Sequence, residues 1–515
     1  MLKFVDDFLN KTTMYRLVFY VLSSFFVCAM ILSLLGLLPF TPLSLILSLL
    51  AILLISYAVN FTFSYIYKAS TNVESVYITA LIMFFLITPP LKGGDYSQFL
   101  FLVFWASIFA MGSKYILAIG RKHIFNPAAV AMVLLAFILN LSANWWIGTP
   151  AMLPFVLLGG ALMARKICRL DLVLSFMISA LASISFFAFL DGSTFSGIFH
   201  TLILTLTNSA FFFFAFIMLT EPLTGPTTKW PRIAFGILVG FLFSPLLHIG
   251  PYYSTPELAL VIGNIFAYLA GPKEKLFLKL KERIKAGADT YDFIFQKDKK
   301  FNFKPGQYME WTLSHTHSDV RGVRRYFTLA SSPTEPDIRL GVKFYDRPSS
   351  FKKALLALGV GEEIIASQKS GDFVLPKNID TELVFIAGGI GITPFRSMVQ
   401  YLLDKKEKRK ITLLYSNKRV SDIAYKEIFD RAEKELGIKT LYVITDELPD
   451  ETIADSRTYN GFINAEVLQK EVPEYMDKIF YISGPHSMVD AFEKTLKSIG
   501  VPRKNIKTDF FPGFA

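Results

Sequence analysis

The sequence predicts an α-helical transmembrane bundle of about ten helices, fused to an antiparallel β-barrel and then to a doubly wound α/β domain. First, the chain of 515 residues exceeds the ~100–200 residues of one domain. Second, its 52% hydrophobic residues concentrate before Pro272: up to Gly271 there are 13 Lys and Arg and 8 Asp and Glu, against 40 and 34 afterwards. Third, strand-like runs and then alternating strands and helices follow. A membrane protein with a globular tail is therefore expected.

Ten apolar segments approach the ~20 residues that a helix needs to cross the hydrocarbon core. They lie at about 15–38, 43–67, 73–91, 98–119, 126–143, 152–167, 170–190, 196–219, 232–249 and 257–271. The sixth and tenth are short. We expect residues 1–271 to form the transmembrane domain, whose partner is the lipid bilayer.

Basic residues alternate between successive connections of this domain. Lys3, Lys11 and Arg16 lie before or at the start of the first segment, and every second connection carries Lys or Arg, whereas LPFTPLS and SANWWIGTP carry neither. Lys92 is the exception. The positive-inside rule then predicts a multi-pass protein of the cell membrane with both termini in the cytoplasm. The N-terminus has no cleavage site after its first span, which favours a retained anchor over a signal peptide.

A basic run follows the last segment. We interpret residues 272–285 as a juxtamembrane linker that contacts an anionic leaflet. The formal net charge of +11 therefore indicates membrane contact, and nucleic-acid binding is not expected.

The chain has two cysteines, Cys28 and Cys168, and neither lies in a CxxC pair. A disulfide framework, a cysteine-ligated iron–sulfur cluster and a structural zinc site are thus disfavoured, and no metal site is predicted. Redox chemistry would have to use organic cofactors or haem.

The soluble half divides into two parts that differ in their predicted secondary structure. Residues 286–378 contain FIFQ, YMEWTL, YFTLA and IRLGVKFY between Pro and Gly turns, which predicts a β-barrel. Residues 379–515 alternate LVFIAGG, ITLLYS, TLYVIT and IFYISG with helical stretches, which predicts a parallel sheet.

A four-residue stretch at the end of one predicted strand suits a flavin dinucleotide. Such a ligand requires a cation for its diphosphate, an aromatic face for its ring and a hydroxyl near N5. The stretch Arg325, Tyr326, Phe327 and Thr328 supplies all three. Alone, the same pattern also fits a half-buried strand with a surface arginine.

Two Gly-containing turns follow predicted strands. Glycines allow a backbone to approach a phosphate closely, and a helix N-terminus favours an anion. The first turn contains Gly388, Gly389, Gly391, Thr393 and Pro394, and the second contains Ser483, Gly484 and Pro485. The chain ends in DFFPGFA, whose aromatics occupy what is usually a frayed tail.

These three motifs, in this order, resemble the ferredoxin–NADP reductase superfamily over roughly residues 286–515. The resemblance implies an FAD-dependent NAD(P)H oxidoreductase in which residues 286–378 bind FAD and residues 379–515 bind NADH or NADPH. Arg325 would contact the diphosphate, Phe327 would stack on the ring, and Thr328 would lie at N5.

Further roles follow from the same resemblance. Ser349 or Ser350, in GVKFYDRPSS, matches a second flavin-phosphate segment, and Thr393 would lie near the nicotinamide. Ser483 stands where many members have Cys, which bears on hydride transfer rather than on binding. Phe511 or Phe514 would cover the flavin.

The choice of nucleotide stays open. Asn417, Lys418 and Arg419 could meet a 2′-phosphate or could form a solvated loop.

In the membrane half, three clusters combine polar and turn-forming residues with apolar spans, which suggests function but also suits helix caps. They are ITALIMFFLITPPL, GRKHIFNPAAVAM and LTEPLTGPTTKWPRIAFGILVG. In this order they resemble the family of the B subunit of the sodium-pumping NADH–quinone reductase and the D subunit of the Rnf complex, over roughly residues 70–270. Asn126, Thr224 and Thr227 are flavin-binding candidates there.

In that family a Thr of a Ser-Gly-Ala-Thr stretch carries covalent FMN through its phosphate. The matching place here is Ser196-Gly197-Ile198-Phe199, and a phenylalanine cannot form the phosphoester. We therefore expect no attachment at Phe199. Thr194 or Thr201 could be shifted acceptors, and a noncovalent second flavin, FMN or riboflavin, stays open.

Haem is the competing redox group, as in the ferric reductase and NADPH oxidase family. That bundle needs pairs of His on facing helices. Only His123, His200 and His248 lie in or near the segments, and no predicted helix contains two. Haem is therefore disfavoured.

The expected function is a membrane NAD(P)H dehydrogenase. Electrons would pass from cytoplasmic NAD(P)H through FAD into the bundle and on to a flavin, quinone or outer-face acceptor, with additional redox subunits as partners. Two rival hypotheses remain: a flavin or small-molecule transporter with an attached reductase, and a bundle that is only an anchor.

Overall fold

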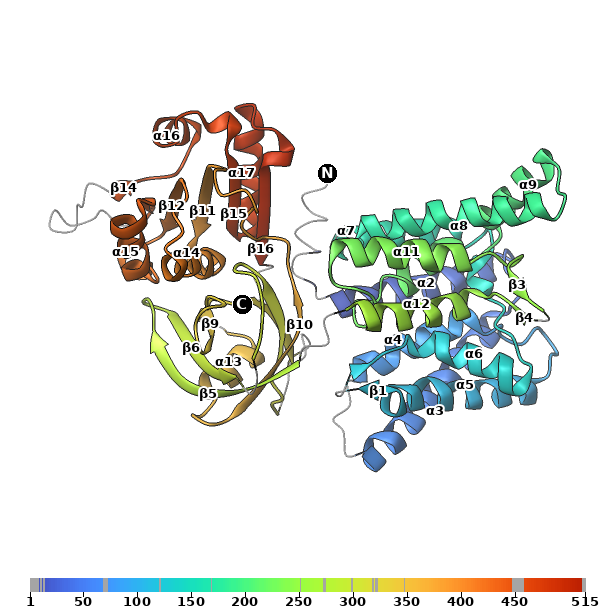
Figure 1. Ribbon diagram of the computed structural model, residues 1–515. Helices are drawn as coiled ribbons and strands as arrows, with labels where there is room; N and C mark the ends of the chain where they lie inside the picture. Colours follow the sequence, from blue (N-terminus) through green and yellow to red (C-terminus); the bar gives the residue numbers. More distant parts are fainter. Residues whose placement is uncertain are drawn as a thin grey trace. The chain divides into compact units, whose positions relative to one another are not determined.

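The computed structural model describes residues 9, 12, 14–67, 73–119, 122–167, 169–250, 252–271, 275–297, 300–316, 319, 323–346, 348–446 and 458–511. The chain divides into two compact units, Met1–Pro272 and Lys273–Ala515 (Figure 1). Cys168 and Phe514 lie outside the described residues.

Within the first unit, helices occupy each of the ten predicted apolar segments. They are α2 (Met14–Leu34), α3 (Pro42–Tyr67), α4 (Val73–Leu86), α5 (Tyr96–Ile116), α6 (Pro127–Leu139), α7 (Leu153–Ile167), α8 (Leu170–Leu190), α9 (Phe195–Thr207) with α10 (Phe211–Phe213) and a π-helix (Phe214–Met218), α11 (Lys229–Leu242) and α12 (Pro256–Ala270). Short hairpins, β1 (Ala118–Ile119) with β2 (Lys122–His123) and β3 (His248–Ile249) with β4 (Tyr252–Tyr253), lie between some of them.

Four of the described helices, α2, α3, α5 and α8, are long and apolar enough to cross a membrane. A fifth candidate is the segment 195–218, which is broken by a 60° bend between α9 and the short helices after it. The unit is therefore a helical apolar region with four or five candidate spans.

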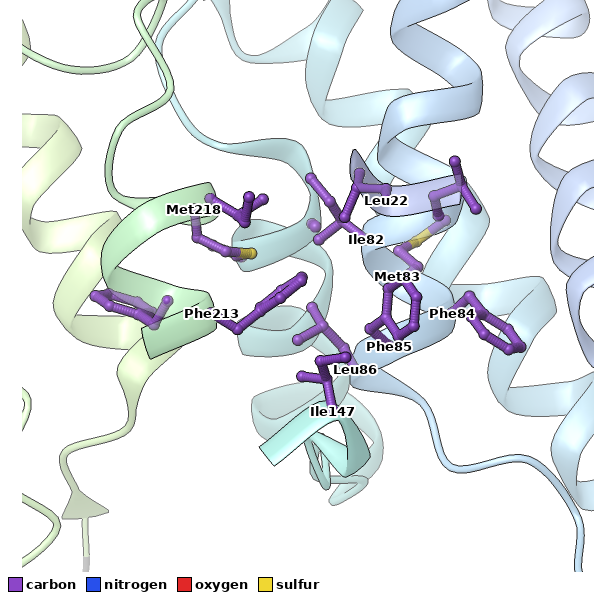
Figure 2. Close-up of a cluster of buried hydrophobic side chains, with 14 of the residues drawn as sticks. Leu22, Ile82, Met83, Phe84, Phe85, Leu86, Ile147, Phe213 and Met218 are labelled. Atoms are coloured by element: carbon purple, nitrogen blue, oxygen red, sulfur yellow. The ribbon is translucent and has the colours of Figure 1, made fainter. Parts of the chain in front are cut away.

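Large apolar side chains from several helices fill the centre of this unit. Phe84 and Phe85 of α4 and Phe213 of α10 meet there, and the Trp146 indole donates to the Phe84 carbonyl at 2.6 Å. Figure 2 shows this cluster, in which the side chains of α2, α4 and the segment 211–218 point toward one another.

Glycines set the approach of α8 and α11. A Cβ at Gly240 would lie 2.6 Å from the Phe176 carbonyl oxygen, and one at Gly236 would lie 2.8 Å from the Leu172 oxygen. Small residues at such contacts let two helix backbones pack closely.

The second unit begins with a six-stranded antiparallel sheet in the order β8-β7-β10-β5-β6-β9. Its strands are β5 (Lys275–Lys285), β6 (Thr290–Lys297), β7 (Tyr308–Thr312), β8 (Arg324–Thr328), β9 (Ile338–Lys343) and β10 (Glu363–Ser370), with α13 (Ser350–Ala357) before β10. β8 and β9 end the strand order, and the Ala330 N–H donates to the Arg339 carbonyl beside them at 3.0 Å. The strands that the structure describes thus pair as an antiparallel sheet with β8 and β9 at its two ends.

The prediction of a linker over residues 272–285 is wrong, because residues 275–285 form β5, which lies between β10 and β6 in the sheet. Leu276, Leu278 and Leu280 are buried, whereas the positions beside them hold Lys275, Phe277, Lys279 and Lys281. Alternation of buried and outward-facing positions is the signature of a half-buried strand. The basic side chains are the outer face of this strand.

The remaining residues form a six-stranded parallel sheet in the order β14-β13-β12-β11-β15-β16. The strands are β11 (Leu383–Gly388), β12 (Ile411–Asn417), β13 (Lys439–Ile444), β14 (Thr458–Asn460), β15 (Ile479–Pro485) and β16 (Ile506–Phe511). The helices are α14 (Thr393–Lys405), α15 (Lys426–Leu436), α16 (Ala465–Glu471) and α17 (His486–Ser498).

Strand order reverses at β11, which pairs with β12 on one side and β15 on the other. Ligands of open parallel sheets bind beyond the carboxyl ends of the strands at such a switch point. Both predicted glycine turns lie there, because one follows β11 and the other ends β15.

Candidate functional site

Arg325 is buried on β8 and faces the start of α13. Its guanidinium lies 5.4 Å from the Phe351 ring centre and 3.6 Å from the Asp319 carboxylate, and it donates to the Arg324 carbonyl at 2.6 Å. Alternation along the strand leaves its neighbour Tyr326 exposed, with a hydroxyl that donates to Glu310 at 3.0 Å.

The α13 N-terminus completes an anion site beside this guanidinium. The Ser349 hydroxyl caps the helix by accepting from the Lys352 N–H, and the Ser350 N–H donates to Asp319 Oδ2 at 3.0 Å. The Asp319 carboxylate shows that an anion is stable between Arg325 and the N–H groups at the helix start. The arrangement fits a phosphate group.

Phe327 and Thr328 end β8. Phe327 is half-buried and lies 5.9 Å from the Phe351 ring, centre to centre. Thr328 is buried, and within the described part of the chain its Oγ1 has no hydrogen-bond partner. Buried polar atoms are rarely left unpaired, so an orphaned hydroxyl at this position fits contact with a ligand.

The turn after β11 has a backbone that favours glycine. Gly389 adopts φ +52°, and a Cβ at Gly388 would collide with the Met488 sulfur. A short 3₁₀ turn over Gly389–Ile392 then leads into α14, whose first residues Thr393 and Pro394 are buried.

The turn that ends β15 packs directly against the first. A Cβ at Gly391 would lie 2.6 Å from Gly484 Cα, and one at Gly484 would lie 3.3 Å from Gly388 Cα. Pro485 ends the strand and precedes α17. Ser483 is fully buried, and its Oγ has no hydrogen-bond partner among the described residues. The two turns therefore form one backbone-lined surface at the switch point.

Asp509 is a site residue that the sequence did not predict. It pairs with Ser483 in the parallel β15–β16 register, so both side chains point to the same face of the sheet. Its Oδ2 is enclosed and accepts no hydrogen bond from any described residue, and burial raises the pKa of this carboxyl to about 7. An acidic residue inside the strand-like run IKTDFF was the available signal.

Phe511 lies in β16 opposite Pro485, which places its backbone at the same edge. Its side chain lies outside the described residues. Lys418, one of the candidates for a 2′-phosphate, is exposed and lies 3.9 Å from the Asp446 carboxylate.

In the helical unit, Asn126 lies at the centre of a buried polar cluster. Its backbone N–H donates to Asn264 Oδ1 at 2.9 Å, and its side-chain amide donates to Glu221 Oε2 at 3.0 Å. Thr224 also donates to this oxygen, at 3.1 Å, and His123 Nε2 lies 3.7 Å from Glu221 Oε1. The sequence did not predict that this acid and this imidazole belong to the cluster.

Thr227 lies one turn after Thr224, and its carbonyl accepts from Arg232 at 3.2 Å. Arg232 also donates to the Asp171 carboxylate at 2.6 Å. These contacts fix the entry into α11.

The other flavin candidates lie apart from this cluster, on α9. Thr194 caps the helix by accepting from the Gly197 N–H, and Thr201 donates to the Gly197 carbonyl at 3.0 Å. Ser196 is exposed, as is Phe199. Within the described residues of α9, no side chain is buried.

Two family models match the chain. Residues 147–270 match the NQR2, RnfD, RnfE family, and residues 385–494 match the oxidoreductase NAD-binding domain. Together with the candidate spans, the first match identifies the helical unit as a membrane domain. The second identifies the C-terminal unit as a reductase module of the FAD- and NAD-binding kind.

Relatives of known type match part of the chain. The flavohemoprotein of Bacillus subtilis (strain 168) is 28% identical over 209 residues, 41% of this chain and 51% of that protein. The F subunit of the Na(+)-translocating NADH-quinone reductase of Serratia proteamaculans (strain 568) is 33% identical over 186 residues, 35% of this chain and 43% of that protein. The chain thus spans about half the length of these relatives.

Among solved structures, the FAD/NAD-binding domain of nitric oxide dioxygenase from Vibrio cholerae O1 biovar El Tor is 20% identical, with a TM-score of 0.41. The match covers 46% of this chain and 98% of that one. The cytochrome b5 reductase domain of Ulva prolifera nitrate reductase is 22% identical with the same TM-score and the same two coverages.

The enclosed carboxyl of Asp509 predicts a pH-dependent stability. Burial raises the pKa of this carboxyl from 3.8 to about 7. The contribution of the protonated carboxyl to the free energy of unfolding is therefore complete below pH ~4 and is lost as the pH rises through ~7. Asp509→Asn should therefore raise the thermal midpoint of the purified chain at pH 8 relative to wild type, by an amount equivalent to about 1–2 kcal/mol, and much less at pH 4.

The exposed Asp477→Asn serves as the control and should leave the difference between pH 4 and pH 8 unchanged. Equal pH dependence of wild type and Asp509→Asn would contradict the burial of a neutral acid at this position.

Proposed function

We propose that this chain, which joins a region of the NQR2, RnfD, RnfE family to an oxidoreductase NAD-binding domain, is a membrane-bound NAD(P)H dehydrogenase. It passes electrons from NAD(P)H through FAD into the membrane domain, toward a flavin, quinone or outer-face acceptor. The observation that carries this proposal is the pair of glycine turns at the switch point, with the orphaned Ser483 Oγ and Asp509 Oδ2 beside them.

The FAD half of the site draws on the first sheet. Arg325 and the N–H groups at the start of α13 hold the diphosphate, with Ser349 and Ser350 at the helix end, and Asp319 yields its position to the ligand. Thr328 directs its hydroxyl to the ring edge. FAD supplies, when bound, a ring that accepts a hydride and releases electrons one at a time.

The nucleotide half draws on the parallel sheet. Gly388, Gly389 and Gly391 let the dinucleotide backbone approach β11, and the α14 N-terminus favours its phosphates. Ser483 and Asp509 place a hydroxyl and a carboxyl, whose pKa burial raises to about 7, at the nicotinamide end. When it is protonated, Asp509 can donate a hydrogen bond that a carboxylate cannot, and so supplies part of what a cysteine thiol would offer there.

The membrane domain receives the electrons. We assign ten spans to it, with both termini in the cytoplasm, because basic residues alternate between connections. The cluster of Asn126, Glu221, Thr224 and Asn264 is the proposed acceptor region, since intramembrane polar groups are costly to bury. A closed barrel is likewise assigned to β5–β10, and additional redox subunits are expected partners.

A transporter for a flavin or similar small molecule, with an attached reductase, is the second candidate. The broken helix over residues 195–218 favours it, because discontinuous helices form substrate sites in many transporters.

FAD binding tests the reductase assignment. Arg325→Gln should lower the affinity of the purified chain for FAD by about tenfold or more, because the diphosphate loses a buried charge-assisted contact. Arg324→Gln, which changes the exposed neighbour on the same strand, should bind FAD as wild type does. The measurement is flavin fluorescence titration of the deflavinated chain, and equal affinity of both variants would contradict the assignment.

Orientation is tested with sealed vesicles. Inverted vesicles should oxidise added NAD(P)H rapidly, whereas right-side-out vesicles should do so only after permeabilisation, because the reductase unit is assigned to the cytoplasmic face. Rapid oxidation by intact right-side-out vesicles would place the unit outside.

A further inference from the structure

Arg396 links the nucleotide-binding turn to the flavin-binding strand. It lies in the first turn of α14, three residues after Thr393, and is only 3% exposed. The same turn carries the glycine segment of β11 into the helix. The position of this guanidinium therefore constrains the backbone that would hold the nicotinamide.

The partners of Arg396 belong to the segment that follows Thr328. Its Nη1 donates to the Ala330 carbonyl at 3.0 Å, two residues beyond Thr328. Its two Nη atoms grip both carboxylate oxygens of Glu335, with Nη2 at 2.9 Å from Oε1. The adjacent Ser397 hydroxyl donates to the Ser331 carbonyl at 2.6 Å. Helix α14 is thus bound to the flavin segment at three places.

Glu335 is itself fixed from the flavin side. It accepts from the Ser332 N–H at 2.6 Å and from Arg339 Nε at 3.1 Å. Although burial would raise the pKa of Glu335, the hydrogen bonds and charge of Arg396 hold that pKa below its usual range. The pair is therefore a lasting ion pair with bidentate geometry, the kind that fixes both distance and orientation.

A second contact between the same two parts lies beside the first. Asp292 of β6 binds Arg339 at 2.9 Å and accepts from the Tyr425 hydroxyl, which comes from the parallel-sheet side, at 3.3 Å. A Cβ at Gly341 of β9 would lie 2.8 Å from the Thr393 methyl group. The β9 backbone at Gly341 and the Thr393 side chain are therefore too closely packed to admit an additional methyl group.

Buried ion pairs contribute little net stability, because removing both charges from water costs about as much as their attraction returns. The bidentate arginine between the two ligand-binding segments is therefore better explained by the fixed distance and orientation that it imposes than by the stability that it adds. We infer that Arg396 is a positioning residue for hydride transfer: it holds the nucleotide turn at a fixed distance from Thr328, and so sets the approach of the two rings. The inference rests on the proposed function.

In the reaction that this geometry would serve, the C4–H bond of NAD(P)H would break as a flavin N5–H bond formed. The hydride would carry both electrons, so that NAD(P)⁺ and reduced flavin would result. Transfer requires reacting atoms ~3–3.5 Å apart, and a misplacement of ~1 Å costs about 10²-fold in rate.

The test measures the flavin-reduction rate constant by anaerobic stopped flow, on the full chain purified with FAD. Arg396→Lys keeps the charge that neutralises Glu335 but loses the planar two-point grip. Its rate constant should fall about 10- to 100-fold, with a primary deuterium isotope effect retained when the transferred hydrogen is deuterium. Nucleotide dissociation constants and FAD content should stay within about threefold of wild type.

Arg409→Lys is the matched control. Arg409 is also a buried arginine of the parallel-sheet side, paired with Glu407 at 2.6 Å and bonded to the Pro376 carbonyl at 2.9 Å, but it lies away from the nucleotide turn. It should reduce flavin at the wild-type rate. If Arg396→Lys does not fold, Glu335→Gln weakens the same grip from the opposite side and should slow reduction in the same way.

The outcomes separate the inference from the function on which it rests. A wild-type chain whose FAD is not reduced by either nucleotide overturns the proposed function. A reducible wild type in which Arg396→Lys and Glu335→Gln match Arg409→Lys overturns the positioning role. A loss confined to nucleotide affinity or FAD content also overturns it, because a positioning residue acts on the rate constant.

Discussion

The structure depends on the close approach of two backbone turns at one edge of the parallel sheet. Gly391 lies against the Ser483 carbonyl and Gly484, with space for no side chain between them. This approach brings the α14 N-terminus, a buried serine and the Asp509 carboxyl to one place. The proposed nicotinamide-dinucleotide site depends on that contact, since any larger residue at Gly391 would separate the two turns.

The same edge explains why the second unit contains charges that are deeply buried yet paired. Arg396 and Glu335 join the helix after the glycine turn to the segment after Thr328, while Asp292, Arg339 and Tyr425 join the neighbouring strands. Such networks contribute orientation more than stability. In the membrane domain, Asn126, Asn264 and Glu221 form a comparable hydrogen-bonded network. Apolar side chains in their place would have needed no hydrogen-bond partners.

Local patterns in the sequence predicted much of this arrangement. Hydropathy located the helical segments, and glycine turns after apolar strands located the switch point, because both signals are contiguous in the chain. The basic residues of 275–285 suggested a linker, but Leu276, Leu278 and Leu280 are spaced two apart and form the buried face of a strand. The bend at 195–218 could not be predicted, because hydropathy does not report the direction of a helix.

Contacts between distant residues could not be predicted from one sequence. Asp509 meets Ser483 only through strand register, and Arg396 meets Glu335 only because two folded parts of the chain come together. His123 and Glu221 are likewise separated by nearly a hundred residues, and no local pattern in the sequence indicates that the two side chains meet.

The flavin content of the purified chain, read with its absorbance spectrum after acid precipitation, tests the central claim most directly. An electron path from the reductase unit into the membrane domain predicts two flavins per chain, counted as acid-released plus protein-bound flavin, with none attached at Phe199, which cannot form a phosphoester bond. A single flavin per chain would contradict the relay and favour the transporter or a plain anchor. A haem Soret band would contradict it outright.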